Sequence, residues 1–102
     1  RNVAPDLCEA CLSRQERAWL MNQRDLSLGR AFLHLWTLKE AVIKATGMGL
    51  QAELKAFTVL PFPPRIVEAS PELGSDRRWE LRQWTTPEGF IVALARRERI
   101  NV

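Results

Sequence analysis

The sequence has no tyrosine, one histidine (His34), two cysteines, and no long apolar run. A membrane-spanning helix needs about 18 or more consecutive apolar residues, so we expect no membrane segment. Cys8-Glu-Ala-Cys11 gives one Cys-x-x-Cys pair, and a structural zinc site needs a second pair of ligands. We therefore expect both cysteines to lie in or beside the core on a short helix. Two thiols without a disulfide framework are typical of a reducing cytoplasm.

The chain is rich in apolar side chains and carries a small excess of positive charge. With 102 residues, 46% of them hydrophobic, and four tryptophans, it has the size of one small domain or half of a larger protein. Fifteen basic and twelve acidic residues give a net charge of +3. This balance suits an anionic ligand or an acidic partner. The basic residues are spread along the chain, which argues against a nucleic-acid interface.

Residues 32–50 have the pattern of the second half of a long helix. No proline interrupts them, Gly47 and Gly49 suit a left-handed C-cap, and Ser27 is placed to cap the helix start. At about 100° per residue, one stripe is apolar and is the expected core face. That face consists of Ala31, Leu35, Leu38, Val42 and Ala45.

The opposite stripe combines charged and apolar residues: Trp36, Glu40, Ile43, Lys44 and Gly47. Glu40 and Lys44 have the i,i+4 spacing of an ordinary surface ion pair, worth about 0.2–0.5 kcal/mol. Spacing alone favours that interpretation over a functional site. The sequence pattern of residues 36–50 as a whole favours a functional site instead.

Residues 36–50 read Trp-Thr-Leu-Lys-Glu-Ala-Val-Ile-Lys-Ala-Thr-Gly-Met-Gly-Leu. This segment resembles the signature of the 4′-phosphopantetheinyl transferase superfamily: an aromatic residue, two residues, Lys-Glu-Ala, two residues, Lys, then Gly-x-Gly-Leu or Gly-x-Gly-Ile. The matching positions are Trp36, Lys39, Glu40, Ala41, Lys44, Gly47, Gly49 and Leu50. Tryptophan at the aromatic position is more similar to the two-lobed surfactin-type branch than to the short holo-acyl-carrier-protein synthase branch.

The resemblance implies an enzyme that moves the phosphopantetheine arm of coenzyme A to a serine of an acyl or peptidyl carrier protein and releases 3′,5′-ADP. Such enzymes serve fatty acid, polyketide and nonribosomal peptide synthesis. It implies that Glu40 binds Mg²⁺ and helps to deprotonate the serine, and that Lys44 faces the pyrophosphate. Lys39 would be a second phosphate or carrier contact. Trp36 would form a wall of the coenzyme A site.

The resemblance also implies how the chain is organised. Surfactin-type members pair two α+β lobes, with coenzyme A between them, and residues 1–102 resemble the C-terminal lobe. The family's Gly-x-Asp-x-Glu strand, with its acidic magnesium ligands, is not in this sequence. We expect the chain alone to transfer little or no phosphopantetheine, and to be active when joined to an N-terminal lobe.

The remaining elements fit an α+β lobe, with shorter capped helices and the long helix packed on a small antiparallel sheet. A short helix is expected at 7–12 with Asp6 as its cap, and a second helix ends near Asn22. Ser13 and Glu16 have capping-box spacing at its start. The family carries a similar Ser/Thr-x-x-Glu, so a site role for this pair is the second interpretation.

Strands are expected at 54–60 and 65–68, a loop at 70–77, and a hairpin at 79–85 and 90–96 around the turn 86–89. The segment 90–96 lacks polar alternation, which predicts a central strand buried on both faces. Trp79 and Trp84 have opposite parity, so one should face the helices and the other the far side of the sheet. The basic run 96–99 is expected to be a solvated strand end.

Two other functions are compatible with the sequence. The chain could be a non-catalytic carrier-protein interaction module or a degenerate transferase lobe, which an upstream in-frame Gly-x-Asp-x-Glu segment would argue against. It could also be a small basic nucleic-acid-binding domain, which would bind with a steep salt dependence.

Overall fold

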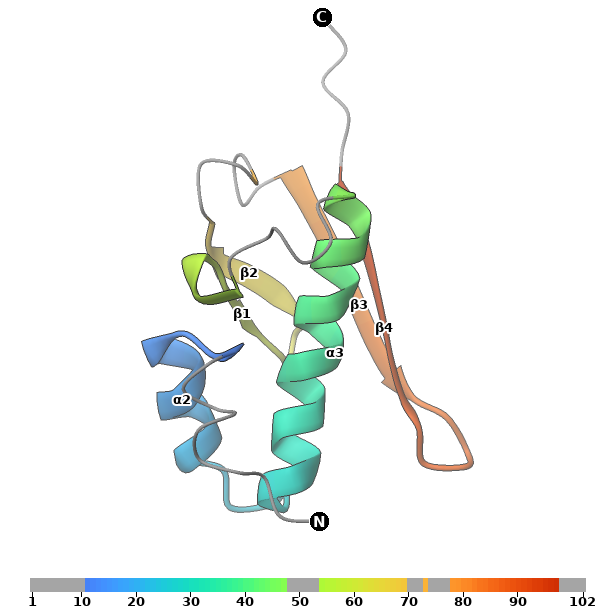
Figure 1. Ribbon diagram of the computed structural model, residues 1–102. Helices are drawn as coiled ribbons and strands as arrows, with labels where there is room; N and C mark the ends of the chain where they lie inside the picture. Colours follow the sequence, from blue (N-terminus) through green and yellow to red (C-terminus); the bar gives the residue numbers. More distant parts are fainter. Residues whose placement is uncertain (1–10, 48–53, 70–72, 74–77, 98–102) are drawn as a thin grey trace, which may run out of the picture.

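The computed structural model describes residues 11–47, 54–69, 73 and 78–97, which form an α+β fold (Figure 1). The elements follow one another as α2 (Arg14–Met21), α3 (Leu28–Thr46), a short 3₁₀ turn η2 (Leu54–Ala56), β1 (Thr58–Leu60), β2 (Arg65–Glu68), β3 (Trp79–Thr85) and β4 (Ile91–Arg97). The predicted fold class is confirmed. The expected cap at Asp6, Cys8 and residues 7–10 of the short helix expected at 7–12 lie outside the described residues. Cys11 is buried in the core, as expected.

Both described helices begin where the sequence predicts. Ser13 and Glu16 form a complete capping box at the start of α2, because each side chain accepts a hydrogen bond from the other residue's backbone amide. The hydroxyl of Ser27 accepts from the Arg30 amide, 3.2 Å away, at the start of α3. Gly47 ends α3 with φ = 71°, the left-handed conformation that glycine adopts at little cost. Gly49 is outside the described residues.

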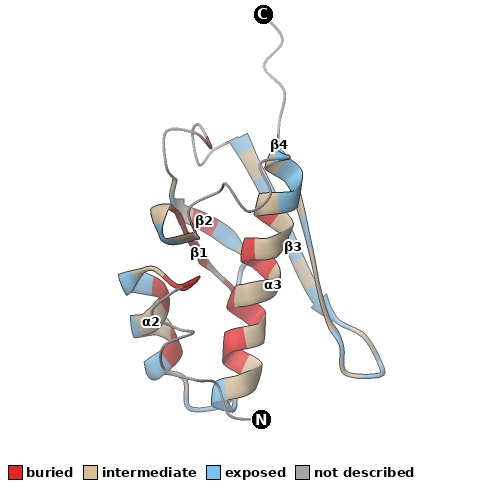
Figure 2. Ribbon diagram, in the orientation of Figure 1, coloured by how far each residue is buried: buried red, intermediate tan, exposed pale blue. Residues whose placement is uncertain are grey.

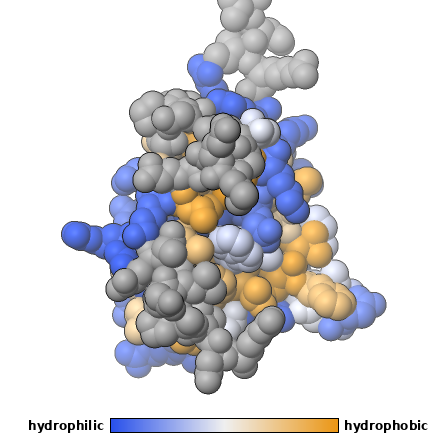
Figure 3. Space-filling view, in the orientation of Figure 1, coloured by the Kyte–Doolittle hydropathy of each residue, from blue (hydrophilic) through white to orange (hydrophobic). Residues whose placement is uncertain are grey.

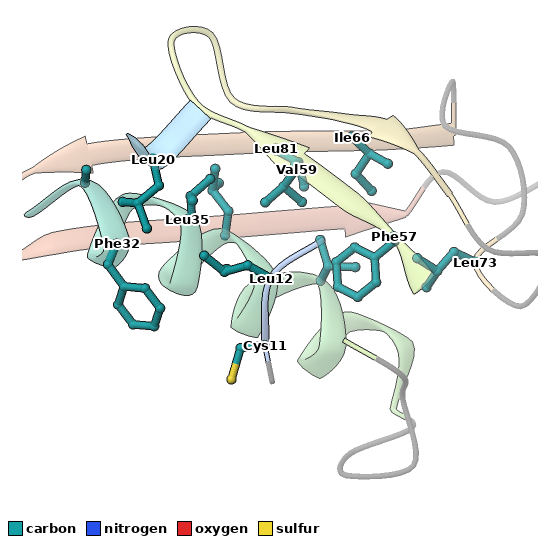
Figure 4. Close-up of a cluster of buried hydrophobic side chains, with 13 residues drawn as sticks. Cys11, Leu12, Leu20, Phe32, Leu35, Phe57, Val59, Ile66, Leu73 and Leu81 are labelled. Carbon is teal, nitrogen blue, oxygen red and sulfur yellow. The ribbon is translucent and has the colours of Figure 1, made fainter. Parts of the chain in front are cut away.

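The core lies between α3, α2 and the strands (Figures 2 and 4). Four of the five residues predicted for the core face of α3 are buried: Ala31, Leu35, Leu38 and Val42. Ala45 is exposed, so this part of the prediction is wrong. Its neighbour Lys44 and the C-cap Gly47 are exposed as well, because the last turn of α3 extends past the core. Lys39, by contrast, is a charged residue that lies inside the core.

The first hairpin is shorter than predicted. Residues 54–56 form the turn η2, and only Thr58–Leu60 are a strand, although Phe57 and Val59 are buried. β1 pairs with β2 in antiparallel register, with an irregularity between Thr58 and Val59. The predicted strand at 65–68 is confirmed.

The second hairpin has the predicted strands and the turn at 86–89, and β3 and β4 are paired over their full length. Trp79 packs against the core and Trp84 is 49% exposed, which confirms their opposite orientation. The prediction that the last strand is buried on both faces is wrong, because Leu94 is 54% exposed. Among the described residues β4 pairs only with β3, and its central position in the sheet stays a prediction. α3 covers one face of the hairpin and nothing described covers the other.

Candidate functional site

The signature residues of α3 are divided between two sides of the helix. Trp36 and Glu40 are half-buried and Lys44 is exposed, and Trp36 packs partly against the edge of the core. Lys39 is fully buried on another side. The structure therefore brings Trp36, Glu40 and Lys44 together on one stripe of α3 and places Lys39 apart from them.

Glu40 and Lys44 carry opposite charges one helical turn apart and yet do not pair. The ion pairs within the described residues are Lys39–Glu16, Arg82–Glu80 and Arg96–Glu80. The surface ion pair that spacing alone favoured is thus not formed. A half-buried carboxylate and an exposed ammonium, neither engaged by a described residue, are both available to a ligand.

Trp36 lies one turn before Glu40 on the same stripe. Its ring stacks on that of Phe32, with centroids 6.2 Å apart and the planes inclined by 10°. Since Phe32 is buried, this contact ties the indole to the core. The aromatic residue is therefore held against the core at one end of the candidate stripe.

Glu40 by itself is an incomplete metal site. Within the described residues, no three His, Cys, Asp or Glu side chains lie close enough to hold a metal ion. Mg²⁺ is bound through oxygen and commonly takes only one or two protein carboxylates together with substrate phosphates. The carboxylate of Glu40, which pairs with no described residue, fits one position of such a set, and the other ligands must come from outside the described residues.

Lys39 forms a buried ion pair with Glu16. Its ammonium nitrogen Nζ lies 2.9 and 3.0 Å from the two carboxylate oxygens of Glu16, and 2.8 Å from the carbonyl oxygen of Phe57. It also lies 4.1 Å from the centroid of the Phe57 ring. Burial lowers the pKa of Lys39, and the charge and hydrogen bonds of Glu16 oppose that shift. Three acceptors use the three ammonium protons, so this lysine is satisfied inside the protein.

The Glu16 carboxylate joins three elements. Besides Lys39 of α3, it accepts hydrogen bonds from the backbone amide of Ser13 at the start of α2 and from that of Val59 in β1, each 2.7 Å long. Thr58 adds a bond from its hydroxyl to that of Ser13, 2.7 Å long. Sequence reasoning found the capping role of Glu16 but missed its partner, because Lys39 lies 23 residues away in the chain.

A comparison with protein-family models gives a match to the 4′-phosphopantetheinyl transferase superfamily over residues 1–95. The chain belongs to this superfamily. The match includes α2, α3, both hairpins up to Ala95, and the stripe with Trp36, Glu40 and Lys44. No curated protein and no solved structure matches the chain.

Membership of the 4′-phosphopantetheinyl transferase superfamily gives the chain a phosphopantetheinyl transferase-type function at the family level. Coenzyme A is the co-substrate and a carrier protein the acceptor in this superfamily. None of the described helices has both the length and the apolar character that crossing a membrane requires.

Proposed function

We propose that this chain is the C-terminal lobe of a surfactin-type, two-lobed cytoplasmic enzyme, and that it supplies half of the site for transfer of phosphopantetheine to a carrier-protein serine. The observation that carries the proposal is that Trp36, Glu40 and Lys44 share one stripe of a superfamily helix, and that neither charged group pairs with a described residue. In the transfer, the serine oxygen bonds to the phosphorus that bears the pantetheine arm. The bond from that phosphorus to the bridging oxygen breaks, and 3′,5′-ADP leaves.

The residues of α3 have separate parts in this reaction. The Glu40 carboxylate accepts the proton of the serine hydroxyl, directly or through water, which makes the oxygen a better nucleophile. The Lys44 ammonium lies near the pyrophosphate and offsets the charge that develops on the leaving group. Trp36 borders the pantetheine arm and keeps water from the site.

Glu40 would hold Mg²⁺ through its carboxylate, and the ion would supply positive charge against the pyrophosphate. We propose that its remaining protein ligands are carboxylates outside the described residues, contributed when the two lobes are joined. The contact of Lys39 with a phosphate or with the carrier stays a prediction. It would require the ammonium to leave the acceptors on Glu16 and Phe57.

Mass spectrometry of an apo carrier protein tests the proposal. The carrier is incubated with coenzyme A, Mg²⁺ and the polypeptide that joins this chain to an N-terminal lobe, and it should gain the mass of phosphopantetheine. Glu40→Ala should slow transfer by about 10²–10⁴-fold, and Lys44→Ala by about 10²–10³-fold. Arg82→Ala, an exposed substitution on the outer face of β3, is the matched control and should transfer normally.

If the Glu40→Ala variant keeps the helix content of the parent and transfers phosphopantetheine at the wild-type rate, Glu40 has no part in the mechanism. Carrier binding without any mass gain in the joined polypeptide would favour the interaction module instead. That alternative has one observation in its favour, namely that the described residues contain no group of three or more His, Cys, Asp or Glu side chains that could hold a metal ion.

A further inference from the structure

The buried ion pair of Lys39 and Glu16 lies one residue along the chain from the candidate site. Both side chains have 0% exposed surface, so the hydrophilic areas that Figure 3 shows belong to other residues. Lys39 is part of the superfamily signature, yet it lies apart from the stripe of Trp36, Glu40 and Lys44. A part in the reaction that keeps the contacts of its ammonium must therefore act through the helix itself.

The contacts of this pair attach α3 to two other elements. The ammonium of Lys39 donates to both carboxylate oxygens of Glu16 on α2, at 2.9 and 3.0 Å, and to the carbonyl oxygen of Phe57, directly before β1, at 2.8 Å. The Glu16 carboxylate is held in turn by the backbone amides of Ser13 and Val59, each 2.7 Å away. A side chain of α3 thus ends in a set of acceptors that α2 and β1 keep in place.

These acceptors restrict the rotation of α3 about its own axis. The core face of α3 is buried through apolar side chains, and apolar burial is non-directional. Hydrogen bonds to charged groups, by contrast, have a narrow range of distance and angle. A buried ion pair adds little stability compared with apolar residues of similar volume. Orientation of the helix is therefore the contribution that this pair makes and apolar residues would not.

Glu40 takes its direction from the same turn of α3. Consecutive residues of an α-helix point about 100° apart, so any rotation that moves Lys39 turns Glu40 through the same angle. A carboxylate about 6 Å from the helix axis moves by about 1 Å when the helix turns by about 10°. A misplacement of about 1 Å can slow a reaction about 10²-fold. The position of the Glu40 carboxylate thus depends on the acceptors that hold Lys39.

We propose that Glu16 and Lys39 are positioning residues, and that their buried pair sets the rotation of α3 and directs the Glu40 carboxylate into the site. Neither residue touches coenzyme A or the carrier protein, and both act through Glu40. The inference rests on the proposed function, because it gives the pair a part in the same transfer. A direct contact of Lys39 with a phosphate is the competing possibility, and it gives a different kinetic result.

Steady-state kinetics of the polypeptide that joins this chain to an N-terminal lobe test the proposal. The double variant with Glu16→Gln and Lys39→Met removes both charges, so that neither remains buried without its partner. Its kcat should fall about 10²-fold, and KM for coenzyme A and for the carrier should stay within about twofold. Glu16→Asp, which keeps the charge on a shorter side chain, is a milder variant and should lower kcat about tenfold with the same unchanged KM.

A cycle with Glu40→Ala separates positioning from a general loss of structure. In the Glu40→Ala background, the double substitution should slow transfer by no more than about a further twofold, because the group that the pair directs is already absent. Leu20→Ala is the matched control. Leu20 is buried one turn after Glu16 on α2, and its truncation removes core packing but no bond of the pair. This control should be less stable and keep the parent kcat.

The rotation of α3 can also be measured without any reaction. Residual dipolar couplings of backbone N–H bonds vary periodically along a helix, and the phase of this variation reports the rotation of the helix about its axis. In the full chain, the phase for α3 relative to α2 should shift by about 10° or more in the double variant. It should not shift in Leu20→Ala.

An unchanged kcat in the folded double variant would overturn the positioning role. An unchanged phase of the couplings, or a full 10²-fold effect in the Glu40→Ala background, would do the same. A raised KM for coenzyme A with the parent kcat would assign Lys39 a direct contact with a phosphate. Failure of the wild-type joined polypeptide to transfer phosphopantetheine would overturn the proposed function itself, and the couplings would then decide separately whether the pair orients α3.

Discussion

The carboxylate of Glu16 shows how much one buried residue can determine in a chain of this size. It neutralises Lys39 and also accepts backbone bonds from Ser13 and Val59, so that all its contacts lie inside the protein. A buried pair is a weak source of stability when compared with apolar residues, but removal of one member leaves an uncompensated charge. Because Lys39 is adjacent in sequence to Glu40, the pair also fixes the turn of α3 that carries the candidate site.

Glu16→Gln should therefore destabilise the fold by about 3–5 kcal/mol, since the buried Lys39 would lose its counter-ion. Urea unfolding measures this loss. Lys39→Met should be costly as well, and the double variant should lose less than the sum of the two. Glu80→Gln is the matched control, because the ion pairs of Glu80 are at the surface, and its effect should be below about 1 kcal/mol. Additive losses would contradict a coupled pair.

For single residues, the success of sequence reasoning depends on how far apart the interacting partners lie along the chain. The capping box of Ser13 and Glu16 was predictable, because both partners lie within one helical turn. The burial of Lys39 was not, because its partners Glu16 and Phe57 are brought to it by the tertiary fold. The placement of Glu40 beside Trp36 followed from helical periodicity alone.

Among the elements, α3 was the most predictable. Its C-terminal end at Gly47 depends on the backbone conformation of that glycine. Gly47 has φ = 71°, and a Cβ added there would meet no atom within 4 Å. Any cost of a side chain at this position is therefore conformational and not steric crowding by neighbours. By contrast, η2 and the exposure of Leu94 in β4 were missed, since the apolar pattern of a sequence does not tell a short turn from a strand, or a strand buried on both faces from one that is exposed on one face.

Gly47→Ala should lower stability by about 1–2 kcal/mol, the cost of the left-handed conformation for an ordinary residue. Gly47→Asn should lose less, because asparagine tolerates this conformation better. Thermal unfolding of the two variants measures the difference. If Gly47→Ala and the parent were equally stable, α3 could end without the left-handed conformation at residue 47 and lose no stability.

At the scale of the whole molecule, a polar contact holds the second hairpin on α3. The side-chain nitrogen of Gln83 donates to the carbonyl of His34 at 2.7 Å and to the hydroxyl of Thr37 at 2.9 Å. Nδ1 of His34 donates in return to the Gln83 oxygen, 2.8 Å away. A further bond, 2.7 Å long, joins the Arg30 guanidinium to the carbonyl of Gly89 in the turn. These contacts link segments more than forty residues apart, and none was visible in the sequence.

Gln83→Ala should therefore loosen the hairpin as a unit. It leaves the buried His34 ring nitrogen and two acceptors on α3 without their partner, at a cost of about 1–3 kcal/mol. Native-state hydrogen exchange should show faster opening of β3 and β4, with α2 and α3 still protected, because the hairpin would open without global unfolding. Arg82→Ala, one residue away on the exposed face, is the matched control and should leave exchange unchanged. Uniform acceleration in every element would instead mean that hairpin and helices unfold together, with Gln83 contributing only to global stability.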